Sequence, residues 1–162
     1  MNIAFIGIGS NMGGREKNCL DAVRLIEETG AGRILKRSSL HHTPPYGFER
    51  QDWFINAVLK METGLGPREL FRSLKSIETR LGREPGFRWG PRLIDLDLLF
   101  YNAIVLKSQD LVVPHPGIPD RRFVLEPLAE IEAELIHPVL KKSVSEMLNN
   151  LDFSGEREVL AA

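Results

Sequence analysis

Two aspartates, Asp95 and Asp97, stand two residues apart within the otherwise apolar stretch 94–101. In a β-strand, residues two apart project from the same face, with Cα atoms about 6.6–6.8 Å apart. The Mg²⁺ ions of a two-metal phosphoryl-transfer site lie about 3.5–4 Å apart, and Mg²⁺ takes only one or two protein carboxylates. The pair therefore fits a metal site for phosphate chemistry. The alternative is a pair of exposed aspartates on the solvent face of an edge strand.

Four arginines precede this pair in the segment 80–92, which carries a local charge of +3 because it contains one glutamate: Arg80, Arg83, Arg88 and Arg92. The planar guanidinium group suits bidentate contacts with phosphate oxygens. Arginines on a loop next to metal-binding carboxylates are the parts of a polyphosphate site. A solvated run of surface charges is the alternative.

Smaller signals lie elsewhere in the chain. The glycine-rich segment 7–11 lacks the GxGxxG and GxxxxGK[ST] patterns, which argues against a dinucleotide fold or a P-loop. Asn56 lies inside an apolar strand pattern, where its amide either satisfies the backbone or contacts the edge of a heterocycle. His115 stands between two prolines and could donate to phosphate, or simply pack. Cys19 lies on an apolar helix stripe and is expected in the core.

Hydrophobic periodicity and turn residues indicate the elements that must position these side chains. Strands are expected at 3–8, 33–42, 54–63, 94–101 and near 111–113; helices are expected at 15–29, 67–81, 120–126 and 144–150, with Pro127 ending or kinking the third. The order β-α-β-β-α-β predicts an α+β, ferredoxin-like core. Such a core has an antiparallel sheet with two helices on one face. A small C-terminal helical extension follows, within a single domain over 1–162.

The composition limits the class of protein. The chain has 162 residues, 43% of them hydrophobic, and a formal net charge of −1, which excludes a disordered chain and disfavours a duplex-DNA binder. No apolar run reaches the roughly 18 residues of a membrane span. The N-terminal segment does not resemble a secretory signal, and Cys19 is the single cysteine, so we expect a cytoplasmic protein with no nucleic-acid or membrane partner. We also expect a monomer.

Residues 88–100 read RWGPRLIDLDLLF and resemble the signature of the hydroxymethyl-dihydropterin pyrophosphokinase family, in which G-P-R-x-x-D-L-D precedes apolar residues. The resemblance spans roughly residues 3–140. It also covers the segments 8–11, 43–45, 56–57, 81–83 and 113–115, together with Arg121 and Phe123. The ferredoxin-like fold of that family agrees with the element order.

The resemblance implies a reaction and a set of residues. Family members transfer the β,γ-pyrophosphoryl group of ATP to the hydroxymethyl group of 6-hydroxymethyl-7,8-dihydropterin, releasing AMP, in folate biosynthesis. Two Mg²⁺ ions would be held by Asp95 and Asp97, with Arg83 and Arg92 as the catalytic arginines. The ATP contacts implied are Glu78, Arg83, Trp89, Arg92, Ile94, His115 and Arg121. The pterin contacts implied are Gly9, Thr43, Pro44, Pro45, Phe54, Asn56, Trp89, Asp95 and Phe123.

Two other functions remain open from the residues alone. One is a ferredoxin-like ligand-binding module without catalysis, which would need no aspartate pair. The other is a nucleotide-sugar transferase with a DxD motif, which the length of the chain and the missing dinucleotide-type half-domain disfavour. Mg²⁺-dependent release of AMP separates the pyrophosphokinase from both.

Overall fold

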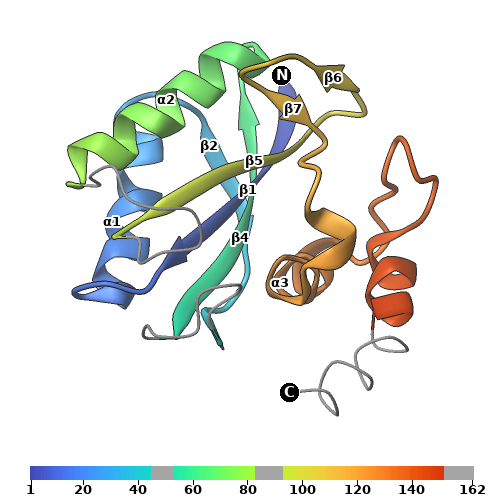
Figure 1. Ribbon diagram of the computed structural model, residues 1–162. Helices are drawn as coiled ribbons and strands as arrows, with labels where there is room; N and C mark the ends of the chain where they lie inside the picture. The colour runs from blue at the N-terminus through green and yellow to red at the C-terminus, as the bar shows by residue number, and fades with distance from the viewer. Residues whose placement is uncertain (45–52, 83–92, 152–162) are drawn as a thin grey trace.

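The structure, a computed structural model, describes residues 1–44, 53–82 and 93–151 (Figure 1). Its strands are β1 (Asn2–Ser10), β2 (Arg33–Arg37), β3 (His41–Thr43), β4 (Phe54–Thr63), β5 (Asp95–Tyr101), β6 (Leu106–Lys107) and β7 (Val112–Val113). Its helices are α1 (Arg15–Glu28), α2 (Pro67–Arg80), the short 3₁₀ turn η1 (Ile118–Asp120), α3 (Arg122–Glu132) and a last helix over residues 144–151. None of the described helices has the length and apolar character that crossing a bilayer requires.

The main sheet is antiparallel and has the strand order β2–β4–β1–β5. Strand β3 pairs with β4 beyond the end of β2, so both short strands follow one edge of β4. Strands β6 and β7 form a separate hairpin, of which the sequence predicted only the second strand. The expected antiparallel sheet is thus confirmed, with β5 at one edge.

The expected continuous strand over 33–42 is wrong, because the ladder is interrupted at Ser38. The Ser38 hydroxyl accepts a hydrogen bond from the Val58 N–H at 2.9 Å and donates to the Ser39 carbonyl oxygen at 2.8 Å. A serine side chain here replaces backbone groups that a regular strand would supply. The edge therefore consists of two short strands rather than one.

Two apolar layers cover the two faces of the sheet (Figure 1). Helices α1 and α2 pack on one face over Ile6, Ile8, Leu96 and Leu98, and the buried Cys19 belongs to this layer, as expected. Helix α3 and the 144–151 helix pack against the opposite face. This second layer is built on Phe5, Val58, Leu99 and Phe100.

Of the two outcomes predicted at Pro127, an end or a kink of the helix, the end is wrong, because α3 continues through Pro127 to Glu132. A proline inside a helix removes one backbone donor, which favours a break. Val124, Leu125 and Leu128 on the same helix are buried against the sheet. Their burial, at about 1.5–3 kcal/mol for each large apolar side chain, offsets the missing hydrogen bond.

Candidate active site

The candidate site lies on the part of the α3-side face that the apolar layer does not use. Leu96 and Leu98 point into the α1–α2 core, so the alternation of β5 directs Asp95 and Asp97 to the other face. Across the sheet, Gly9 is opposite Asp95 and Gly7 is opposite Asp97. The two positions of β1 next to the aspartates on this face are therefore glycines; Gly9 is buried, and the Leu99 side chain lies 3.5 Å from a Cβ atom built at Gly7.

The aspartate pair carries more negative charge than its surroundings stabilise. Burial raises the pKa of Asp97 to about 7, and the adjacent Asp95 carboxylate adds to the rise. Lys75 and Arg121 oppose this shift, while Glu78 increases it. A divalent cation with a preference for oxygen ligands would remove this repulsion, so the donor set fits Mg²⁺. Among the described residues, no group of three or more histidines, cysteines or acids forms a larger metal cluster.

Strand β5 is held at this point by two side chains of α2. Glu78 Oε2 accepts a hydrogen bond from the Leu96 N–H at 2.7 Å, and Lys75 Nζ donates to the Leu96 carbonyl oxygen at 3.0 Å. Lys75 and Glu78 also form an ion pair at 3.1 Å, with the Glu78 side chain only 6% exposed. Leu96 is the residue between the two aspartates, so this pair fixes the backbone that carries them.

A second group of residues gathers around Gly9 on the same face. The Asn56 side-chain amide donates a hydrogen bond to the Thr43 hydroxyl, and Asn56 is opposite Gly9 in the β1–β4 pairing. A Cβ atom at Gly9 would lie 2.9 Å from Asn56 Oδ1 and 3.6 Å from a Phe54 ring carbon. A side chain at position 9 would therefore force the Asn56 amide to move, and glycine keeps this backbone next to an amide that has both a donor and an acceptor.

His115 is a neutral hydrogen-bond donor in this arrangement. Its Nδ1 accepts a hydrogen bond from the Gly117 N–H at 3.1 Å, which assigns the ring proton to Nε2. Burial lowers the pKa of His115 to about 4, and the Arg121 charge lowers it further. The backbone N–H of His115 donates to the Leu99 carbonyl oxygen at 2.9 Å, so the loop is anchored to β5.

Arg121 connects the two groups. Its guanidinium carbon lies 5.7 Å from the centre of the Phe123 ring, and its charge acts on both Asp97 and His115. A Cβ atom at Gly117 would come within 2.5 Å of Arg121 Nε, so glycine at 117 makes room for this side chain. The short segment 117–123 thus carries both the Arg121 charge that acts on Asp97 and the aromatic ring of Phe123.

The structure brings together most of the predicted site residues that it describes. Pro44 directly follows β3, next to Thr43. Ile94 is completely buried in the α1–α2 core, so the structure does not present this residue to a ligand. Pro45, Arg83, Trp89 and Arg92 lie outside the described residues.

Sequence reasoning missed the roles of Lys75 and Gly117. The spacing of three between Lys75 and Glu78 indicates an ion pair on a helix. Nothing local indicates that the pair reaches a strand 18 residues further along the chain. Gly117 carries no motif at all.

Comparison with known proteins finds relatives over most of the chain. The family model for 7,8-dihydro-6-hydroxymethylpterin-pyrophosphokinase (HPPK) matches residues 5–133. The 2-amino-4-hydroxy-6-hydroxymethyldihydropteridine pyrophosphokinase of Methylorubrum extorquens is 41% identical over 159 residues, which cover 98% of this chain and 99% of that protein. The protein of the same name from Bacillus subtilis is 45% identical over 130 residues, covering 80% of this chain and 78% of that protein.

Solved structures match the fold over nearly the whole chain. An HPPK-DHPS crystal structure in complex with substrates matches with a TM-score of 0.76 at 17% identity, covering 96% of this chain. Plasmodium falciparum HPPK-DHPS with pteroate matches with a TM-score of 0.74 at 17% identity, covering 92% of this chain. This chain spans 44% and 42% of those two chains, so the likeness concerns the fold of one part of each.

Proposed function

Because the chain belongs to the 7,8-dihydro-6-hydroxymethylpterin-pyrophosphokinase family, we infer that it is an ATP-dependent pyrophosphokinase of folate biosynthesis. It transfers the β,γ-pyrophosphoryl group of ATP to the hydroxymethyl group of 6-hydroxymethyl-7,8-dihydropterin and releases AMP. The observation that carries this inference is the position of Asp95 and Asp97, side by side on the open face and opposite the glycines of β1. A non-catalytic binding module would have no use for two mutually repelling carboxylates there.

We propose that Asp95 and Asp97 hold two Mg²⁺ ions together with the phosphates of ATP. When bound, these ions would supply charge neutralisation at the triphosphate and polarise its phosphorus–oxygen bonds. Asp97, with its pKa raised to about 7, gains most from a cation, because burial has removed water that would otherwise stabilise its charge.

The remaining charged groups then act on the phosphates. We assign Arg121 and the neutral His115 to phosphate oxygens, His115 through its Nε2 proton; the Gly117 N–H bond to Nδ1 and the lowered pKa of His115 support this. We assign Arg83 and Arg92 to the charge that develops when the pterin hydroxyl attacks the β-phosphorus and the AMP oxygen leaves. Glu78 and Ile94 are assigned to the nucleotide side, Glu78 by holding Leu96. Catalysis then rests on positioning and electrostatics rather than on a protein nucleophile.

The pterin is proposed to lie over Gly9, with its polar edge read by Asn56 and Thr43. Support comes from the bare backbone at Gly9 and from the Asn56–Thr43 hydrogen bond, which orients the amide. The rings of Phe54 and Phe123 would stack on the pterin, which is flat and apolar on both faces. Pro44, Pro45 and Trp89 complete the proposed substrate surface.

The finer fold assignment is also a proposal. The strand order β2–β4–β1–β5 and the shared face of α1 and α2 support a ferredoxin-like core, with α3 and the 144–151 helix as its C-terminal extension. The chain would form one domain over 1–162.

The decisive experiment incubates the protein with ATP, Mg²⁺ and 6-hydroxymethyl-7,8-dihydropterin and separates the nucleotides. We expect AMP and the pterin diphosphate in equal amounts, and no product when Mg²⁺ is chelated. Release of ADP would instead show a single phosphoryl transfer. Pterin binding without any nucleotide product would support the non-catalytic module.

A further inference from the structure

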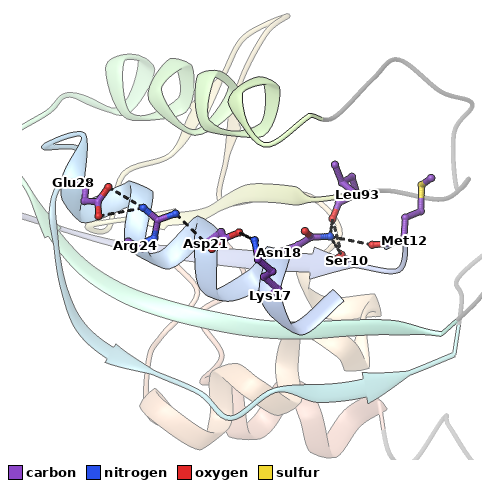
Figure 2. A network of polar contacts seen from close by, with 8 residues as sticks. All are labelled: Ser10, Met12, Lys17, Asn18, Asp21, Arg24, Glu28 and Leu93. Carbon is purple, nitrogen blue, oxygen red and sulfur yellow. Dashed lines mark hydrogen bonds and ion pairs between the residues drawn. The ribbon is translucent and has the colours of Figure 1, made fainter. Parts of the chain in front are cut away.

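We propose that Asn18, a half-buried residue of α1, is a positioning residue for the start of β5 and thereby for Asp95. This inference rests on the proposed function, because it assigns Asn18 a part in the same reaction. Asn18 was not among the residues that the sequence marked for chemistry. Its side chain lies at the junction of the loop after β1, the helix α1 and the residue that precedes β5 (Figure 2).

The contacts of Asn18 account for both hydrogens of its amide. Nδ2 donates to the Leu93 carbonyl oxygen at 3.1 Å and to the Met12 carbonyl oxygen at 3.0 Å (Figure 2). The Ser10 hydroxyl donates to the same Leu93 oxygen at 2.6 Å. Two side chains from the start of the chain thus hold one carbonyl oxygen that lies more than seventy residues further along.

The Leu93 side chain is held as well. Its two methyl carbons face Gly13 and Gly82, where added Cβ atoms would lie 3.5 Å and 3.2 Å away. Both glycines have positive φ angles, +62° and +94°, so both turns present bare backbone to this leucine. Leu93 is therefore fixed at its carbonyl group and at its side chain.

This junction lies close to both halves of the proposed site. Asp95 follows Leu93 by two residues, with the completely buried Ile94 between them. Ser10, itself fully buried, directly follows Gly9, which is opposite Asp95 in the sheet. A displacement of Leu93 would therefore be transmitted to a proposed metal ligand. Misplacement by about 1 Å can slow a reaction about a hundredfold.

The same helix provides a matched control on its exposed surface. Arg24 pairs with Asp21 at 3.5 Å and with Glu28 at 3.1 Å, and Lys17 pairs with Asp21 at 2.9 Å (Figure 2). These ion pairs lie within α1, and none of the three involves Leu93. Arg24→Ala therefore weakens the helix without touching the junction.

The experiment compares Asn18→Ala, Asn18→Asp and Arg24→Ala with the unmodified protein. The aspartate variant keeps the size of the side chain but replaces the amide donor with an oxygen. We measure kcat, the KM for each substrate, the Tm, and the NMR hydrogen-exchange rates of the Ile94 and Asp95 amides in the ligand-free protein. We expect both Asn18 variants to lower kcat about tenfold, with KM changed less than about twofold. Exchange at Ile94 and Asp95 should quicken about tenfold, and Arg24→Ala should change neither rate.

Two results would overturn the proposal. One is kcat within twofold of the unmodified protein in a folded Asn18 variant. The other is an equal loss of kcat in Arg24→Ala at an equal loss of Tm, because Asn18 would then act only through helix stability. If the unmodified protein releases no AMP, the proposed function fails, and unchanged exchange at Asp95 would separately remove the positioning role.

Discussion

The two faces of the main sheet are built by the same strands and differ in almost every other respect. On the α1–α2 face, Ile6, Ile8 and Leu96 are completely or almost completely buried in a continuous apolar layer. On the opposite face, α3 covers one part, and the other part carries Gly7 and Gly9, the buried Asn56 and the two aspartates. One face stabilises the fold, and the other holds the charges and open backbone that the proposed chemistry needs.

A β-bulge marks the boundary between the two parts of the second face. Phe5 pairs with Phe100 and Ile6 with Leu98, so Leu99 is the extra residue in β5. Both Leu99 and Phe100, two and three residues after Asp97, therefore join the α3-side layer. Bulges near functional sites redirect side chains in this way. The comparison shows that β5 can contribute to both apolar layers and carry two aspartates because a bulge interrupts the alternation of its side chains at one residue.

The largest expected effect comes from removing a charge on the open face. Asp97→Ala should lower kcat by three or more orders of magnitude, because one of two proposed metal ligands is lost. Steady-state kinetics at saturating Mg²⁺ and circular dichroism on the same sample test this. Near-normal turnover in the folded variant would contradict the metal assignment.

A change on the α1–α2 face should lower stability and leave catalysis nearly unchanged. Ile6→Ala removes a completely buried side chain and should lower the free energy of unfolding by about 3 kcal/mol. Urea denaturation measures this loss. We expect kcat to stay within about twofold below the melting temperature. A large fall in kcat would show that the two faces are not functionally separate.

A methyl group added at Gly9 should weaken binding of the pterin. Gly9→Ala places a Cβ atom about 2.9 Å from Asn56 Oδ1, so the amide must move. Such crowding costs about 1–3 kcal/mol, and we expect the Kd for the pterin to rise about 5- to 150-fold. Titration calorimetry measures this. In the control Gly64→Ala the new atom lies 3.9 Å from its nearest neighbour, Met1 Sδ, and unchanged affinity is expected. An equal loss in both variants would refute the proposed pterin surface.

The smallest effect concerns the pH dependence of stability in Mg²⁺-free buffer. The pKa of Asp97 is about 7 in the folded protein and 3.8 in its ordinary state, so the unfolded chain releases this proton first. Asp97 therefore destabilises the fold progressively from about pH 4 to pH 7. Asp97→Asn should raise the free energy of unfolding at pH 8 and leave it unchanged near pH 4. Thermal melts across this range test the sign, and a variant that is less stable at pH 8 would contradict it.

Hydrophobic periodicity correctly predicted one strand and the face on which two side chains of another strand lie, because both depend mainly on residues close in the sequence. The expected strand 54–63 is confirmed as β4, and the alternation around Leu96 correctly places Asp95 and Asp97 on one face. The residues matched for the pterin edge, Gly9 and Asn56, indeed lie opposite each other. The role of each residue in catalysis stays a prediction.

The features that sequence reasoning missed depend on contacts between distant segments. The break after β2 arises from a Ser38 hydroxyl that reaches Val58, which hydropathy cannot reveal. Pro127 lies inside a helix because neighbouring leucines are buried. The contact of Lys75 and Glu78 with Leu96 requires α2 to lie along the edge of β5, and that placement is decided by the whole core.

That contact also protects the molecule from its own copies. An edge strand with free N–H and C=O groups is a template on which a strand of another chain can add, and such addition leads to aggregation. At Leu96 both groups are already occupied by Glu78 and Lys75. At the opposite edge, β2 presents exposed Arg33, Lys36 and Arg37, and bringing two such strands together would bring like charges together. These contacts thus keep the edge that carries the proposed metal ligands from becoming a site of intermolecular strand pairing.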